Sequence, residues 1–104
     1  MSELTSLLAA LLETKLLTDL IKVYNNDNKK YSGEKYDVLD TKLQIFYNCC
    51  LKIGLPNILY NKAFLIMLRG RASNFYYAEI SGRDLKWEVI KYLIKLQFKT
   101  KENL

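Results

Sequence analysis

The stretch from Ala63 to Phe98 constrains the fold more than any other part of the chain. It holds two apolar patterns with helical spacing, joined through a break of small residues at Arg69-Gly70-Arg71-Ala72. The stretch is rich in residues that build a core and poor in residues that do acid, base or metal chemistry. A segment of this kind predicts a protein that works by packing and assembling.

Helical spacing recurs along the rest of the chain, with no segment that alternates as a strand does. One Pro and four Gly in 104 residues favour long elements with short connections. A chain of this length suits one domain, since domains most often have roughly 100 to 150 residues. We therefore predict an all-α fold, a compact bundle of about five helices. Four segments are expected: a leucine-rich helix (1–24), a polar loop (25–36), a helical core (37–99) and a tail (100–104).

The first predicted helix runs from Leu4 to Tyr24 and is apolar all round at residues 7–12. Such a run needs cover on more than one side. Either the chain's own core or another copy of the chain can supply it. The candidate residues for self-association are Leu4, Leu7, Leu8 and Leu11.

The polar loop at residues 25–36 interleaves basic and aromatic residues, as in Lys29-Lys30-Tyr31 and Lys35-Tyr36. Such pairs can contact phosphates and bases. A solvated linker is the interpretation that we favour, because the segment is polar, charged and broken by Ser32-Gly33.

Helix boundaries are marked by capping residues. Asp37 or Asp40 can cap a second helix, whose end is marked by Gly54-Leu55-Pro56. Asn57 is expected to cap a third helix that continues to about Leu68.

The remaining boundaries follow from small and acidic residues. Gly70 is either the end cap of the third helix or a point of close backbone approach. A short fourth helix carries Phe75, Tyr76 and Tyr77, and Asp84 is expected to cap the last helix.

Excess positive charge lies in the second half of the chain. Residues 1–51 contain 6 Lys/Arg and 7 Asp/Glu, whereas residues 52–104 contain 10 and 4. Such an excess can serve nucleic acid, or it can be a plain solvated surface. The nucleic-acid candidates are Arg69, Arg71, Lys91, Lys95 and Lys99.

The sequence has few of the side chains and motifs that enzymes use for catalysis. The sequence has no His, the usual acid, base and metal-binding residue at neutral pH. No phosphate-binding loop, dinucleotide fingerprint or metalloprotease motif occurs. We predict a non-enzymatic chain with no cofactor, no metal and no small-molecule substrate.

The neighbours Cys49 and Cys50 lie in an apolar helical pattern. Adjacent cysteines do not reach ordinary disulfide geometry without strain, so we predict reduced core residues. The opening residues lack a basic n-region, and Glu13 interrupts their apolar run, so neither a signal peptide nor a membrane span is expected. The cytoplasm is the expected location.

From Tyr31 onward the chain resembles the Gag polyprotein of gypsy-class long-terminal-repeat retrotransposons, especially the fungal kind. The matching residues are Tyr31-Ser32-Gly33, Leu43 to Tyr47, Cys50, Gly54-Leu55-Pro56, Ala63-Phe64, Met67 to Ala72, Phe75-Tyr76-Tyr77, Trp87 and Phe98. This resemblance implies the amino-terminal lobe of a capsid protein, an all-α bundle that repeats in a virus-like particle packaging the element's RNA. Its partners would be other Gag chains. The family pattern also places Phe75, Tyr77, Trp87 and Phe98 in the core.

The 104 residues include neither a second capsid lobe nor the CxxC, His and Cys pattern of a zinc knuckle. An excised domain, a domesticated Gag and a shortened Gag are all compatible with this pattern. The alternatives to homotypic assembly are a basic RNA-binding helical module and a peptide-binding or inhibitory adaptor derived from Gag.

Overall fold

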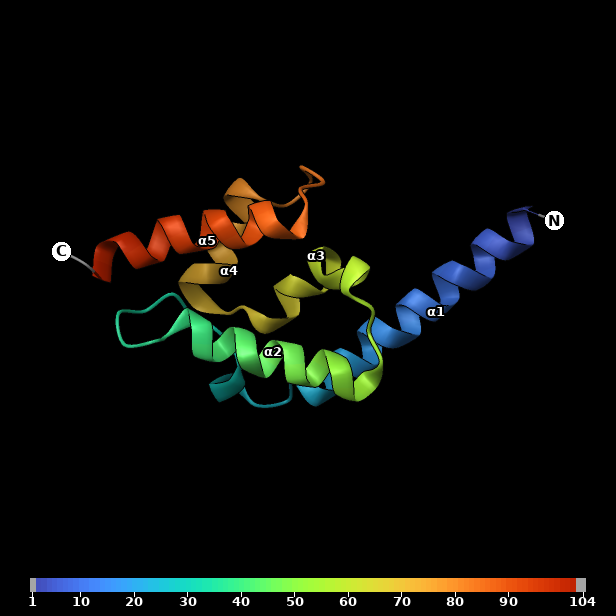
Figure 1. Ribbon diagram of the computed structural model, residues 1–104, viewed down its shortest axis with the longest axis horizontal. Helices are drawn as coiled ribbons and strands as arrows, with labels where there is room; N and C mark the ends of the chain where they lie inside the picture. Colours follow the sequence, from blue (N-terminus) through green and yellow to red (C-terminus); the bar gives the residue numbers. More distant parts are fainter. Residues whose placement is uncertain (1, 103–104) are drawn as a thin grey trace.

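A helical body carries one long helix that extends away from it (Figure 1). The computed structural model describes residues 2–102, and the side chains of residues 3–98. Its α-helices are α1 (Ser2–Val23), α2 (Leu39–Ile53), α3 (Tyr60–Ala63), α4 (Gly70–Glu79) and α5 (Trp87–Glu102). Three 3-10 turns join them: η1 (Asp27–Lys29), η2 (Asn57–Leu59) and η3 (Phe64–Met67). The predicted all-α fold with about five helices is confirmed, and residues 2–102 contain no strand.

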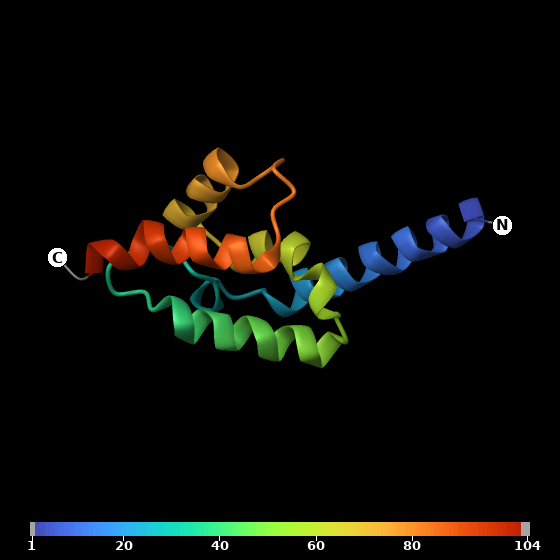
Figure 2. The same cartoon turned by 45° about the horizontal axis from the view of Figure 1, so that its top comes forward.

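The molecule is elongated because α1 continues beyond the body, which both views show (Figures 1 and 2). Its principal extents are 56 × 27 × 18 Å and its radius of gyration is 14.7 Å. A compact domain of this length has a radius of gyration of about 13 Å. The predicted first helix is confirmed within two residues at its start and one at its end. At the other terminus α5 continues to Glu102, so part of the predicted tail is helical.

One buried cluster draws side chains from each helix and from the segment after η1. Helix α2 buries Leu43, Phe46 and Cys50, and α5 buries Ile90, Ile94 and Phe98, whereas Val89, Tyr92 and Leu96 of α5 are exposed. An aromatic group packs between the two helices. The Trp87 ring lies 5.0 Å from that of Phe64 and 5.7 Å from that of Phe46, centroid to centroid. Each such pair contributes about 0.5–1.5 kcal/mol beyond the area that it buries.

Residues 31–33, which we call the strap, cross the interior of the body. Tyr31 and Ser32 are almost completely buried. The Tyr31 N–H donates to the Met67 carbonyl at 2.7 Å, and the Ala72 N–H donates to the Ser32 carbonyl at 3.0 Å. The solvated-linker interpretation is therefore wrong for these residues. Their polarity does not prevent burial, because the backbone groups of another segment satisfy their hydrogen bonds.

The sequence predicts Asp37 as a cap of α2, but in the structure Asp37 binds the strap instead. Its Oδ2 accepts hydrogen bonds from the Ser32 N–H and hydroxyl, both at 2.8 Å. The Lys42 ammonium lies 3.7 Å from its other oxygen. Asp40 does not cap α2 either, because the N-cap residue is Val38, which makes no side-chain cap hydrogen bond. Nothing in the local sequence distinguishes Asp37 as a buried acceptor from Asp37 as a cap.

The predicted third helix is shorter than expected. Residues 57–67 form η2, α3 and η3 in succession, and Asn57 makes no side-chain cap. The chain then becomes extended at Leu68, which forms a parallel bridge with Tyr31. A continuous helix over this stretch would remove the extended backbone that pairs with the strap.

The other two boundary predictions are also corrected. Gly70 begins α4, so the end-cap alternative is wrong, and a Cβ there would make only ordinary contact with the Ser32 carbonyl oxygen at 3.9 Å, so the close-approach alternative is not supported either. Asp84 has φ 52° and precedes α5, which begins at Trp87, so it does not cap that helix. Tyr77, expected in the core, is 62% exposed because it lies on the outer side of α4.

The end of α2 is as predicted. Gly54 adopts φ 78°, and its N–H donates to the last carbonyls of the helix. The Leu55 N–H donates to the Cys50 carbonyl at 2.8 Å, and the Leu55 side chain is buried. Together these bonds satisfy carbonyls that a helix end otherwise leaves unpaired.

Replacement of Gly33 tests how tightly the strap is packed. A Cβ at Gly33 would lie 2.7 Å from the Phe98 ring, whereas one at Gly54 meets no atom within 4 Å. Both glycines have positive φ, so Ala costs about 1–2 kcal/mol at either site. We expect Gly33→Ala to lose about 1–3 kcal/mol more than Gly54→Ala in urea unfolding, because of the added clash. Equal losses would mean that Phe98 moves aside freely.

Candidate interaction surfaces

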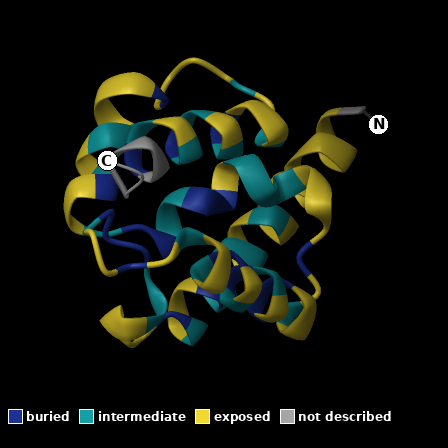
Figure 3. Cartoon of the chain, turned by 60° about the vertical axis from the view of Figure 1, so that its left-hand side comes forward, coloured by how far each residue is buried: buried dark blue, intermediate teal, exposed yellow. Residues whose placement is uncertain are grey.

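The leucines in the first half of α1 are exposed to solvent. Residues 3–12, which we call the arm, lie beyond the body, where α1 is coloured as exposed (Figure 3). The exposed fractions of its five leucines lie between 56% and 61%. All the self-association candidates, Leu4, Leu7, Leu8 and Leu11, are among them, together with Leu12. A contiguous apolar patch of this kind on a protein surface commonly marks an interaction site.

The second half of α1, residues 13–23, is fixed to the body, and we call it the root. Leu20 is fully buried, and Leu16 and Leu17 pack against the core. The Glu13 carboxylate pairs with the Lys62 ammonium of α3 at 2.9 Å, where the root meets the arm. The arm is therefore the free continuation of an anchored helix.

The apolar side of the arm faces away from the body. Successive residues of a helix are about 100° apart, which places the Leu4, Leu8 and Leu11 side roughly 150° around the axis from Leu20. This outward line continues along the whole helix at alternating steps of four and three: Leu4, Leu8, Leu11, Lys15, Thr18 and Lys22. Its members on the root are polar and exposed, as a solvent-facing line should be. Only on the arm does the line become apolar.

Three of the five basic candidates each form an ion pair with a different carboxylate. Arg71 lies 3.8 Å from Glu34, Lys91 lies 3.1 Å from Glu88, and Lys95 lies 4.0 Å from Asp40. The Lys91 ammonium also lies 5.5 Å from the centre of the Trp87 ring. These pairs reduce the net charge that the three cations offer to a nucleic acid.

The two remaining basic candidates do not join that group. Arg69 is half-buried, and its Nε has no hydrogen-bond partner among the described residues. It lines an open depression of about 300 Å³ together with Asp37 and Lys42. The side chain of Lys99 lies outside the described residues.

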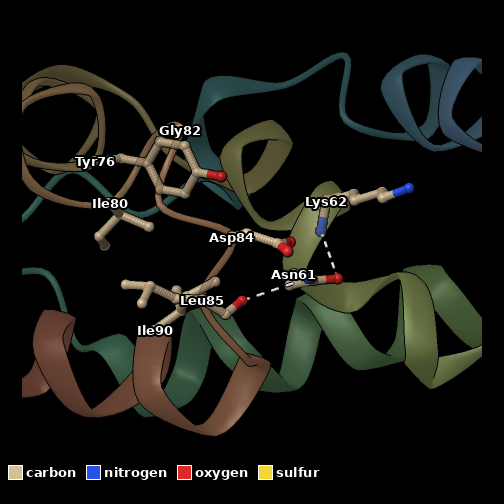
Figure 4. A pocket seen from close by; sticks show the side chains of 8 residues that line it. All are labelled: Asn61, Lys62, Tyr76, Ile80, Gly82, Asp84, Leu85 and Ile90. Atoms are coloured by element: carbon tan, nitrogen blue, oxygen red, sulfur yellow. Dashed lines mark hydrogen bonds between the residues drawn. The ribbon is translucent and has the colours of Figure 1, made fainter.

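A second depression, of about 280 Å³, lies beside α3 and the segment before α5 (Figure 4). The Asn61 amide donates to the Leu85 carbonyl at 3.4 Å, and the Lys62 ammonium points away from the hollow. Asp84 is the one carboxylate among the described residues that line it. The lining also includes the phenol of Tyr76, whose pKa is raised by burial, but the described residues add no second carboxylate with which Asp84 could form a carboxylate pair.

Cys49 and Cys50 are free and buried, which confirms their prediction as core residues. Burial, and in second place the neighbouring Cys49, raises the pKa of the Cys50 thiol from 9.0 to about 12. Burial likewise raises the pKa of the Tyr24 phenol, which lies against the same thiols. A thiol held protonated in this way is a poor nucleophile.

Within residues 2–102, no helix combines the length and apolar character needed to cross a membrane. The same part of the chain contains no cluster of three or more potential metal-binding His, Cys, Asp or Glu side chains. Comparison of the chain with protein-family models, with curated proteins and with solved structures finds no match. Among the described residues, the arm carries the largest group of exposed leucines.

Alkaline pH should destabilise the protein through these buried groups. Because the folded pKa of Cys50 is raised, its contribution is complete below its ordinary value of 9.0 and is lost as the pH rises towards about 12. Each such group adds a slope of up to about 1.4 kcal/mol per pH unit within that window. Urea unfolding at pH 7, 9, 10 and 11 measures the slope.

The matched variant is Cys50→Ala, which removes one titrating group. It should unfold more easily than the wild type at pH 7, where the contribution of Cys50 is complete, and lose stability less steeply above pH 9. An unchanged slope would show that the Cys50 thiol does not titrate differently in the folded and unfolded states.

Proposed function

We propose that this chain is a non-enzymatic assembly module that acts through contacts between copies of itself. The observation that supports this most directly is the arm, with five exposed leucines on a helix anchored only at its other end. Full burial of a leucine contributes about 1.5–3 kcal/mol. Burial of even part of this surface would therefore contribute several kcal/mol to the free energy of binding a partner.

The contrast between arm and root argues that the leucines serve a contact. Along the same outward line of α1, the root presents Lys15, Thr18 and Lys22 to solvent. A helix without a partner on this side would be polar throughout. A change from polar to apolar along one line indicates that the partner covers the arm and stops near Glu13.

The specific form of the proposal is a capsid-type lobe of a retrotransposon or domesticated Gag. The residues that carry the resemblance also hold the body together: Tyr31-Ser32-Gly33 is the buried strap, and Gly54-Leu55-Pro56 ends α2. Met67 to Ala72 is the segment that pairs with the strap. In this proposal the chain assembles in the cytoplasm, where both free thiols stay reduced, and contributes to a shell around RNA.

Direct RNA binding by this chain is a weaker candidate than self-assembly. Three of the five basic candidates have carboxylate partners within 4.0 Å. Each phosphate contact would have to replace one of these pairs. We therefore assign the primary role to protein contacts.

Substitution of Leu8 by Asp tests the proposal. The arm should associate weakly, because about three helical turns bury less than the roughly 1,200 Å² of a stable complex. Leu8→Asp should weaken self-association at least about tenfold, since it places a charge in the contact. Sedimentation equilibrium from micromolar to millimolar concentration measures this change.

The control is Leu51→Asp, at an exposed leucine of α2 far from the arm along the chain. Because both leucines are more than half exposed, each variant should keep its stability within about 0.5 kcal/mol. A wild-type protein that stays monomeric at millimolar concentration contradicts the proposal. Equal weakening by both variants would place the contact elsewhere.

A further inference from the structure

We propose that the arms of two copies pair antiparallel about a two-fold axis that passes between Ala9 and Ala10. This inference rests on the proposed function, since it specifies the partner of the arm as the same segment of a second copy. Such an interface is isologous, because each copy contributes the same surface.

The central run of the arm is symmetric about the proposed axis. Residues 7–12 read Leu-Leu-Ala-Ala-Leu-Leu, a palindrome that is bordered by Ser6 and Glu13, with Thr5 and Thr14 next on either side. In an antiparallel pair centred there, Leu8 lies opposite Leu11 and Leu7 lies opposite Leu12. Every leucine of the central run then meets a leucine of the other copy. The centre of an antiparallel contact is therefore wholly apolar, and the charges on either side of it decide between the antiparallel and the parallel direction.

Charge favours the antiparallel arrangement over a parallel one. Parallel arms in register would place Glu3 beside Glu3 and Lys15 beside Lys15, and like charges at close range are unfavourable. Antiparallel arms place Leu4 opposite Lys15, and Glu3 within one residue of the level of that ammonium. Lys15 is 70% exposed on its own chain, where it pairs with Asp19 at 3.0 Å, so it can also reach a partner.

The position of the body leaves room for the second copy. The leucine side of α1 lies roughly 150° around the axis from the side that packs on the core. Two arms joined through their leucines therefore carry their bodies on the outer sides, and the antiparallel direction puts those bodies at opposite ends. The arm also extends well clear of the body in both views (Figures 1 and 2).

Pairing also gives the arm the apolar packing that it lacks on its own chain. A helix of about ten residues is marginal in water without tertiary packing. The root provides a folded start, but no side chain of the arm is buried on its own chain. Contact with a second arm adds the apolar packing that stabilises most helices in proteins.

Two single-cysteine substitutions, Leu4→Cys and Lys15→Cys, distinguish the arrangements. In the antiparallel pair, residue 4 of one copy lies level with residue 15 of the other. The two copies of residue 4 are then about 16 Å apart along the axis, at 1.5 Å per residue. A disulfide needs Cα atoms within about 7 Å. The experiment treats each variant alone, and then an equal mixture, with diamide as oxidant at a concentration where the wild type associates.

The mixture should form a disulfide-linked dimer at least about fivefold faster than either variant alone. The wild type is the control, and it should form no linked dimer because Cys49 and Cys50 are buried. Faster linkage within each single variant would establish parallel arms and overturn the inference. A lack of linkage, in a protein whose association still needs Leu8, would overturn it by showing that the arm contacts another surface. A monomeric wild type would instead mean that the proposed function itself fails.

Discussion

The backbone hydrogen bonds between the strap and the segment before α4 hold the fold together. Tyr31 and Ser32 are buried, so their N–H and C=O groups need partners within the protein. Met67, Arg69 and Ala72 supply three of those four partners through main-chain hydrogen bonds, and the Asp37 carboxylate accepts from the Ser32 N–H. Because this pairing needs extended chain on both sides, it ends the helical stretch that begins at α3 and determines where α4 can start.

Other features of the body follow from this pairing. Asp37 accepts two hydrogen bonds from Ser32, so the segment that leads into α2 also supports the strap. The Tyr31 and Phe98 rings pack at nearly a right angle, with their centroids 5.8 Å apart, so the end of α5 contacts the same segment. Elements far apart in the sequence are thus joined at one buried segment of three residues. The root of α1 leads directly into this region and is correspondingly well anchored.

The arm contrasts with this arrangement. Its helix is the direct continuation of the root, yet the residues that would face the body are small or polar there, and the leucines turn outward. A fold that buries its core so completely can be stable without the arm. The exposed leucines contribute little to the core of the single chain, and the proposed assembly depends on that separation.

The sequence alone determined the helical class, the leucine-rich first helix, the turn at Gly54-Leu55-Pro56 and the burial of both cysteines. These features depend on local periodicity and on backbone preferences of single residues, which the sequence expresses directly. Tertiary structure decided the burial of Tyr31-Ser32-Gly33, the role of Asp37 as acceptor and the short α3, because each depends on a hydrogen-bond partner distant in sequence. Tertiary structure also decided that Leu4, Leu8 and Leu11 are exposed to solvent. Periodicity identifies an apolar side of a helix, but only the position of the body shows whether that side is covered.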